Sequence, residues 1–484
     1  MSLIKSVSIY GSADFAFKAL NFITFPLYTH VFAVDEYGIL SLVTTLAALV
    51  ALFLNIGIDN AVQRFYWDPS LAPERRPILV TTGFVVLMGS SLLITGVCLC
   101  CIYPFREELL SRYSLPWLLV GIAFIGNIPQ QLVQYAQNTI RLHFSPWKFT
   151  SVAACQNLLT VAMTLLFVFG FNWGLKGFLL GTLVALSCSL PLGLWFIRKD
   201  LVLAFNKQMA MQILKFGYPF IFAGMAFWVF GSMDRWMLGE LSTNTEVGLY
   251  SIAHRLAFIL TLLITAFGQA WSPYVMKLYA EDSSYRVRCG RVLTIWFYLL
   301  IVVFVCIAGF CLEGLMIMTP STYWPAAQCF LFVTLGLVLY GTIQITALGI
   351  SITKKTYHFS IAAWGSAILN FLLNLWLIPK FHAVGAAIAT CAAYGFITAY
   401  YLIMSQRLNP MVLEYRKLLT SLIVLTGVVA TYEGLAQFPW GWWVVFVKAL
   451  VMVGVIIFGF VAKIIIIAEL PEPVRKFFLK RRLS

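Results

Sequence analysis

The sequence predicts an all-α integral membrane protein of about 14 transmembrane helices, with two six-helix lobes around a central cavity and two extra C-terminal helices. Composition is the first observation behind this prediction. Of the 484 residues, 61% are apolar and only 11% are charged, and the mean hydropathy is +0.89. The second is that apolar runs of about 20 residues, each long enough to cross a bilayer core, recur along the whole chain. The third is an internal repeat. This composition excludes a soluble domain, a disordered chain and a disulfide scaffold.

Fourteen apolar runs are expected to form helices, because a helix satisfies its own backbone hydrogen bonds in lipid. Strands of a membrane barrel would alternate in polarity over about ten residues, and these runs do not. The first run contains Asp14 and Lys18, and no small-residue cleavage site follows it, so we expect it to stay as a span. The expected bounds are 8–31, 38–58, 78–103, 115–139, 149–170, 176–197, 216–238, 247–270, 290–312, 327–349, 357–378, 384–404, 418–437 and 442–467.

Basic residues gather on one side of these spans. Of the 33 Lys and Arg residues, 24 lie in one alternating set of connections that includes both chain ends. The other set holds only four, which are Arg106, Arg112, Lys176 and Lys380. The positive-inside rule therefore places both termini in the cytoplasm. The net charge of +14 mainly orients the chain, and it gives no soluble basic face for nucleic acid.

A shift of about 210 residues brings the two halves into register. Residues 36–41 (EYGILS) fall on 246–251 (EVGLYS), and residues 176–182 fall on 384–390. Both copies start in the cytoplasm and hold six spans, so the repeat is parallel, which is typical of transporters whose lobes alternate access to a central cavity. The predicted parts are an N-terminal lobe at 1–205, a C-terminal lobe at 206–410, and two added helices with a basic cytoplasmic tail at 411–484.

The chain has no sign of enzyme chemistry. All predicted connections are short, phosphate-binding glycine loops are absent, and Glu107 and Glu108 are adjacent in an outer connection, where they are expected to be solvated. The ten cysteines form no CxxC pair and have no histidine cluster beside them, so no metal or redox site is expected. We expect no cofactor, with coupling to H⁺ or Na⁺ left open.

Three charges within predicted spans need an explanation, because each costs roughly 2.5–3.5 kcal/mol at the bilayer centre. Asp14 and Lys18 are four residues apart on one helical face of the first span. They would either line the cavity or form a structural pair. Arg255 lies eight residues into the eighth span. Its guanidinium cannot lose its charge and matches phosphate oxygens, so it would bind an anionic ligand or pair with a carboxylate across the cavity.

Other charges lie near span ends. Asp234 and Arg235 are expected near the outer end of the seventh span, where a structural role with a snorkelling arginine is favoured. Asp59 and Arg64 flank the inner end of the second span, and Arg64 would either meet a cytoplasmic phosphate or anchor the helix.

The last two spans carry Glu433 and Lys448, which are expected to be paired or snorkelled. The cluster Trp440-Gly441-Trp442-Trp443 indicates an aromatic belt at the outer interface.

Short motifs over essentially the whole chain resemble the bacterial polysaccharide transport family, the flippases of lipid-linked oligosaccharides within the multidrug/oligosaccharidyl-lipid/polysaccharide exporter superfamily. The order and spacing of the motifs over the fourteen predicted spans carry the resemblance. They are Pro26-Leu27-Tyr28-Thr29, Glu36-Tyr37-Gly38, Gly57-Ile58-Asp59-Asn60-Ala61, Arg64-Phe65-Tyr66, Asp234-Arg235, Leu238-Gly239, Val247 to Ala253 with Arg255-Leu256, Asn370, Asn374, Ile378-Pro379 and Val384-Gly385-Ala386-Ala387.

The resemblance implies a V-shaped pair of six-helix bundles with a cationic cavity in the bacterial inner membrane. It also implies movement of an undecaprenyl-pyrophosphate-linked repeat unit of O-antigen, capsule or exopolysaccharide from the cytoplasmic to the outer leaflet. A polysaccharide polymerase and a chain-length regulator are possible partners.

On this hypothesis Lys18 and Arg255 hold the pyrophosphate, and Asp14 tunes Lys18 or takes part in ion coupling. Gln131 and Gln344 are among the amides expected to face the sugars. The main alternative is a cation-coupled multidrug exporter of the same superfamily, which should prefer acidic cavity residues. Further alternatives are a membrane-embedded polysaccharide polymerase or transferase, and a structural scaffold.

Overall fold

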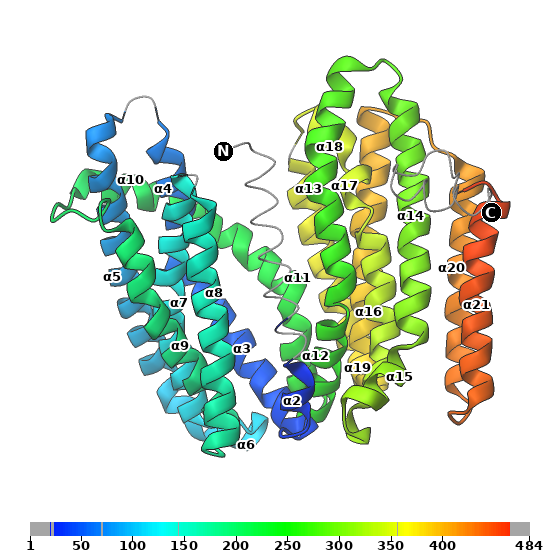
Figure 1. Cartoon of the computed structure of the whole chain (residues 1–484), viewed down its shortest axis with the longest axis horizontal. Helices are drawn as coiled ribbons and strands as arrows, with labels where there is room; N and C mark the ends of the chain where they lie inside the picture. Colours follow the sequence, from blue (N-terminus) through cyan, green and yellow to red (C-terminus); the bar gives the residue numbers. More distant parts are fainter. Residues whose placement is uncertain (1–19, 21–23, 69–70, 144, 356, 465–484) are drawn as a thin grey trace, which may run out of the picture. The chain divides into compact units, whose positions relative to one another are not determined.

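The computed structural model describes residues 20, 24–68, 71–143, 145–355 and 357–464 (Figure 1). These residues form helices joined by short connections, with no strand among them. Ten stretches within these ranges are long and apolar enough to cross a membrane. The prediction of an all-α, multi-pass membrane protein is therefore confirmed, whereas the count of fourteen spans and the cytoplasmic termini stay predictions. Most of the first predicted span, 8–31, lies outside the described residues.

The remaining predicted spans all overlap helices. In the first half the longer helices are α3 (Val34–Asn55), α5 (Arg76–Ile102), α7 (Trp117–Leu142), α8 (Pro146–Leu165), α9 (Gly174–Ile197) and α11 (Pro219–Leu241). Short helices in that half are α2 (Phe25–Thr29), α4 (Ile58–Tyr66), α6 (Arg106–Tyr113) and α10 (Lys207–Gly217).

From residue 244 onward the helices are α12 (Asn244–Leu256), α13 (Phe258–Glu281), α14 (Tyr285–Gly309), α15 (Cys311–Met318), α16 (Ala326–Tyr340), α17 (Ile343–Thr346), α18 (Leu348–Ile352), α19 (Tyr357–Leu408), α20 (Tyr415–Ala436) and α21 (Trp442–Val461). α19 joins the two predicted spans 357–378 and 384–404 across a kink. His382, with φ 48° and ψ −127°, is non-helical at this kink. The predicted break between these spans thus lies at a single residue.

The chain folds into two compact units, of which the first ends at Gly248 and the second begins at Leu249. The sequence predicted a lobe boundary between residues 205 and 206. The first unit extends further, because α10 packs on α4 and α5, and α11 packs on α3. The indole Nε1 of Trp228 in α11 donates to the carbonyl oxygen of Thr45 in α3 at 3.1 Å. The two six-helix lobes and their parallel repeat stay predictions.

In the first unit, small residues let the helices α7, α8 and α9 pack closely. A Cβ at Gly181 of α9 would lie 2.7 Å from the Cα of Thr164 in α8, so no side chain fits at this crossing. The hydroxyl of Tyr28 in α2 lies 2.5 Å from that of Thr164 and fixes the start of the described chain to the same helix. Tyr135 of α7 is buried in the core and donates to the carbonyl oxygen of Val80 at 2.7 Å.

Two glycines that the sequence repeat aligns meet in the first unit. A Cβ at Gly38 would lie 1.8 Å from the carbonyl oxygen of Asn244, and one at Gly248 would lie 2.1 Å from that of Val34. Asn244 precedes Gly248 by as many residues as Val34 precedes Gly38. The starts of α3 and α12 therefore cross backbone against backbone, each through the same position of the repeated motif.

In the second unit, the two C-terminal helices pack on α14. At each of the two contacts, a tyrosine ring lies against a glycine. The hydroxyl of Tyr298 in α14 donates to the carbonyl oxygen of Val455 at 2.6 Å, and a Cβ at Gly459 of α21 would lie 2.4 Å from the Tyr298 ring. Tyr432 of α20 lies against Gly309 of α14 in the same way. The added helices are therefore an integral part of this unit.

The connection between α19 and α20 is held by a charged cluster. The carboxylate of Glu414 accepts from Arg291 at 3.0 Å and from Lys417 at 2.8 Å. Although burial raises the pKa of Glu414, the hydrogen bonds from Lys417, Arg291 and Thr294 outweigh it and hold this pKa below its usual value. This cluster lies among the basic connections that the sequence places in the cytoplasm.

Candidate functional site

The nine predicted site residues do not all fall within the described part of the chain. Asp14 and Lys18 lie outside it, so the pairing of Lys18 with Arg255 stays a prediction. Asp59, Arg64, Gln131, Asp234 and Arg235 belong to the first unit, whereas Arg255 and Gln344 belong to the second.

A break between α3 and α4 positions Asp59. Ile56 (φ 48°) and Gly57 (φ 67°) are both left-handed, which ends α3 at Asn55 and starts α4 at Ile58. A Cβ at Gly57 would lie 2.5 Å from the carbonyl oxygen of Gly217, so the break packs directly on the end of α10. As a result, the first turn of α4 holds Asp59 inside a stretch that is apolar enough to span the membrane.

Asp59 and Gln131 join one hydrogen-bonded cluster through Asn55, which the sequence analysis did not single out. The Nδ2 of Asn55 donates to Asp59 Oδ2 at 2.8 Å and to Gln131 Oε1 at 3.1 Å. Gln131 Nε2 in turn donates to the carbonyl oxygen of Ala51 at 3.2 Å. Asp59 Oδ1 is inaccessible to solvent and makes no hydrogen bond of standard geometry with a described residue, although the Asn138 side chain of α7 acts on the same carboxylate. The cluster thus keeps one buried acceptor that a proton or a donor could satisfy.

Polar residues continue along the same helix α7. Asn127 is buried and donates to the carbonyl oxygen of Ala47 at 2.8 Å, and the charge of Arg141 acts on Asp59. Residues 127, 131, 134, 138 and 141 recur every three or four positions and so form one polar stripe.

Arg64 is not brought to this cluster. It lies in the last turn of α4, where its side chain is exposed. Asp59 and Arg64 are five residues apart and therefore lie on different faces of the helix. The alternatives of a phosphate contact and a helix anchor both stay open for Arg64.

Asp234 and Arg235 lie in α11, about two turns before this helix ends at Leu241. Asp234 is 2% exposed, and its Oδ1 accepts from the backbone N–H of Arg235 at 2.8 Å. The Arg235 guanidinium donates to the carbonyl oxygen of Gly231 at 3.3 Å. The actual end of α11 is held by Glu240, which accepts from Arg112 and from the hydroxyl of Tyr113 in α6. Arg112, which sequence analysis treated as a charge of an outer connection, therefore has a structural partner.

Arg255 lies half-buried in the last turn of α12, within a stretch that is apolar enough to span the membrane. An uncharged polar network joins this helix to α19. The hydroxyls of Tyr250 and Thr390 are 3.1 Å apart, and Asn370 donates to Thr390 at 3.3 Å. Asn374 donates to Asn370 at 3.0 Å. The network ties α12 to α19 five residues before Arg255.

Gln344 lies in α17 with its side chain exposed and placed against Gly268 of α13. The backbone carbonyl oxygen of Gln344 accepts from the indole of Trp271 at 3.1 Å. Phe267 stacks on Trp296 with ring centroids 3.8 Å apart. An exposed amide beside aromatic rings is compatible with a sugar contact, and this role stays a prediction.

The sequence predicted that Lys448 is either paired or snorkelled. The structure shows that it is paired, with a partner that the sequence analysis did not identify. The ammonium of Lys448 lies 2.7 Å from Glu313 Oε1 in α15. Glu313 stands alone in an apolar segment, and that isolation was the signal that could have found it. Asn55 gave no such signal, because a single amide near a helix end is common.

Comparison with known proteins identifies the family. Residues 3–279 match the family model described as polysaccharide biosynthesis protein. The chain belongs to this family. The sequence motifs resembled a polysaccharide transport family, and the match to this family model confirms that prediction.

Three curated relatives are similar to parts of the chain. An uncharacterized membrane protein of Haemophilus influenzae is 24% identical over 289 residues, covering 58% of this chain and 67% of the relative. The Lsg locus putative protein 1 of the same species is 22% identical, covering 57% and 66%. The probable flippase AglR of Haloferax volcanii is 29% identical over 167 residues, covering 33% and 34%. The chain thus spans about two thirds of the length of the first two relatives and about a third of the last.

Solved structures of other proteins share the fold of this chain. The lipid II flippase MurJ, in an inward closed conformation, is similar with a TM-score of 0.68 and 16% identity, covering 92% of this chain and 96% of MurJ. An inward-facing multidrug resistance transporter of the MATE family is similar with a TM-score of 0.61 and 12% identity, covering 84% and 94%. At these identities the likeness concerns the fold alone.

Proposed function

We propose that this protein is a flippase that moves an undecaprenyl-pyrophosphate-linked oligosaccharide from the cytoplasmic to the outer leaflet of a bacterial inner membrane. The family match supports a role in polysaccharide biosynthesis. A relative named as a probable flippase and the fold shared with a lipid II flippase both agree with a translocation step. The chain itself would be a transporter rather than an enzyme, acting beside a polymerase and a chain-length regulator.

The observation that carries the proposal is the position of Arg255. Its side chain is half-buried in a membrane-spanning stretch, where a permanent positive charge is costly. A guanidinium presents several N–H donors in a planar fork, which matches the oxygens of a pyrophosphate. The neighbouring network of Tyr250, Thr390 and Asn370 is uncharged and ties α12 to α19. Lys18 would supply the second cation.

The proposal also includes coupling of translocation to H⁺ or Na⁺, but the proposed role of Arg255 does not require it. Asp14 was expected either to tune Lys18 or to take part in ion coupling. Asp59 offers a second candidate, because its Oδ1 is buried without a hydrogen bond of standard geometry to a described residue. Binding of a cation or a proton there would satisfy that oxygen.

The test is complementation of a deletion strain. Deletion should leave lipid-linked repeat units on the cytoplasmic face, and wild-type protein should restore surface polysaccharide. Arg255→Ala should fail to restore it at wild-type protein levels, while Arg255→Lys should restore it in part because the charge remains. Arg416→Ala is the matched control, since Arg416 is an exposed residue at the start of α20. Full export by Arg255→Ala would contradict the role of Arg255.

The fold shared with a multidrug resistance transporter keeps a second candidate, a cation-coupled drug exporter. A drug exporter should bind cations, for which the buried Asp59 is the better ligand. Loss of drug resistance in the deletion strain, with surface polysaccharide intact, would favour this candidate over the flippase.

A further inference from the structure

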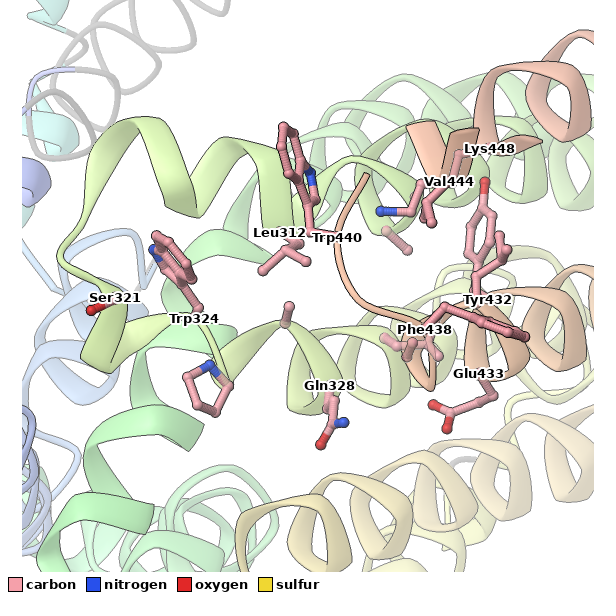
Figure 2. Close-up of a pocket in the computed structure, with 17 residues that line it drawn as sticks. Leu312, Ser321, Trp324, Gln328, Tyr432, Glu433, Phe438, Trp440, Val444 and Lys448 are labelled. Carbon is pink, nitrogen blue, oxygen red and sulfur yellow. The ribbon is translucent and has the colours of Figure 1, made fainter. Parts of the chain in front are cut away.

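The second unit contains a cavity of about 420 Å³ at one end of α14, α16, α20 and α21 (Figure 2). Small-molecule sites commonly have volumes of roughly 300–1,000 Å³. Four aromatic side chains line the cavity, which are Trp324, Tyr432, Phe438 and Trp440. Phe438 and Trp440 are 56% and 45% exposed, so this side of the cavity reaches the surface.

The polar groups of the cavity are rich in hydrogen-bond acceptors. Glu433, Gln328 and Ser321 belong to its lining. Within the described ranges, Glu433 takes part in no hydrogen bond or ion pair. The lining also includes Lys448, but this ammonium is bound by Glu313 at 2.7 Å and its residue is only 8% exposed. The cavity therefore offers a carboxylate and an amide to a ligand, but no available cation.

These charges decide between ligand classes. A phosphate would meet the Glu433 carboxylate with no cation to balance it, so an anionic headgroup is disfavoured. An acyl chain would leave this half-buried carboxylate without a hydrogen bond. A sugar satisfies both halves of the site, because its hydroxyls donate to carboxylate and amide oxygens while its C–H faces stack on aromatic rings.

The place of the cavity in the membrane follows from the predicted topology. The two connections that border it, residues 310–325 and 437–441, contain neither lysine nor arginine. The positive-inside rule assigns such connections to the outer side. Trp440, Trp442 and Trp443 sit at the same end, as expected for an interface.

We propose that this cavity is a saccharide-binding site at the outer membrane interface. Trp324 and Trp440 supply the stacking surfaces, and Glu433 with Gln328 accepts hydrogen bonds from sugar hydroxyls. The sugar comes either from a free saccharide or from the headgroup of a lipid-linked one. Saccharide binding at this cavity does not depend on Arg255 or on translocation.

The experiment is saturation-transfer NMR on the full chain in nanodiscs of phosphatidylglycerol. The probes are methyl β-glucoside and N-acetylglucosamine as free sugars, octyl β-glucoside as a lipid-linked one, and phosphoethanolamine as a competitor of another class. Sugar binding is expected, and tighter binding of the octyl glucoside would assign the lipid-linked source. Glu433→Gln and Trp440→Leu should each weaken binding about 10-fold, because the first replaces a charged acceptor by a neutral one and the second removes a stacking surface. Trp442→Leu is the matched control, since Trp442 is 78% exposed and lies outside the lining.

Three results would overturn the proposal. One is the absence of transfer to any of the sugars in the wild-type protein. Another is sugar binding that is the same in Glu433→Gln, Trp440→Leu and wild type. The third is binding of phosphoethanolamine that depends on Glu433 and excludes sugars. Glu433→Gln preserves the side-chain shape, so a matching thermal melt separates lost binding from lost folding. None of these outcomes bears on whether Arg255 variants still export polysaccharide.

Discussion

The ion pair between Lys448 of α21 and Glu313 of α15 allows a direct test of how the C-terminal helices are attached. The two side chains are 10% and 17% exposed, and their charged atoms are 2.7 Å apart. Glu313 Oε2 is buried and makes no hydrogen bond with a described residue. Replacing Lys448 by Met therefore leaves a buried carboxylate without the cation that pairs with it among the described residues.

The size of the effect follows from this burial. Removing one partner of a buried pair typically costs about 3–5 kcal/mol, because the other charge stays uncompensated. Replacing both partners by uncharged residues of similar volume is often neutral. We therefore expect Lys448→Met to destabilise the protein by about 3 kcal/mol or more, and Lys448→Met with Glu313→Gln to recover most of that loss.

Thermal unfolding in detergent, followed with a thiol-reactive dye, measures this difference. Cys311 is a suitable reporter once the exposed Cys100, Cys101 and Cys188 are replaced by Ser, since it is buried two residues from Glu313. Wild type, both single variants and the double variant complete a double-mutant cycle. Additive losses in the double variant would show that the two charges are not coupled, and an unchanged melt for Lys448→Met would refute the argument from burial.

Three further predictions concern packing and charge. Gly459→Leu should lower the melting temperature, because its Cβ would lie 2.4 Å from the Tyr298 ring, whereas Gly454→Leu should not, because no atom lies within 4 Å. Glu414 has a lowered pKa, so its stabilising contribution is complete above its usual value of 4.5 and is lost as pH falls through the lowered pKa. Melting curves from pH 7 to pH 3 should therefore fall less steeply for Glu414→Gln, and equal slopes would contradict this. Gly38→Ala should reduce the folded yield measured by size-exclusion chromatography, because its Cβ would lie 1.8 Å from a backbone oxygen.

Much of the fold could be predicted from the sequence, because a segment that crosses lipid must be an apolar helix of about 20 residues. Each predicted span from 38–58 onward overlaps a helix, and even the boundary inside α19 was visible as a change in hydropathy before residue 384. The α3–α4 break at Ile56 was less visible, since it depends on contact between Gly57 and Gly217, far apart in the chain. Local patterns do not contain such tertiary contacts.

The candidate site was predicted only in part, for a related reason. Single charges such as Arg255 and Lys448 stand out in an apolar chain because each one is expensive. Which residues pair is not visible, since the lone charges Glu313 and Lys448 are distant in sequence, and Asn55, which donates to Asp59, is an ordinary amide. The sequence therefore marks which residues need an explanation, and the structure of each unit supplies the explanation where the partner lies within it.

The crossing of Gly38 and Gly248 has a consequence for how the repeated motif can vary. At each glycine the place of a Cβ is taken by a backbone carbonyl oxygen of the other helix. A side chain at either position would force the starts of α3 and α12 apart. The two copies of the motif therefore constrain each other, which explains why glycine stands at the same place in both.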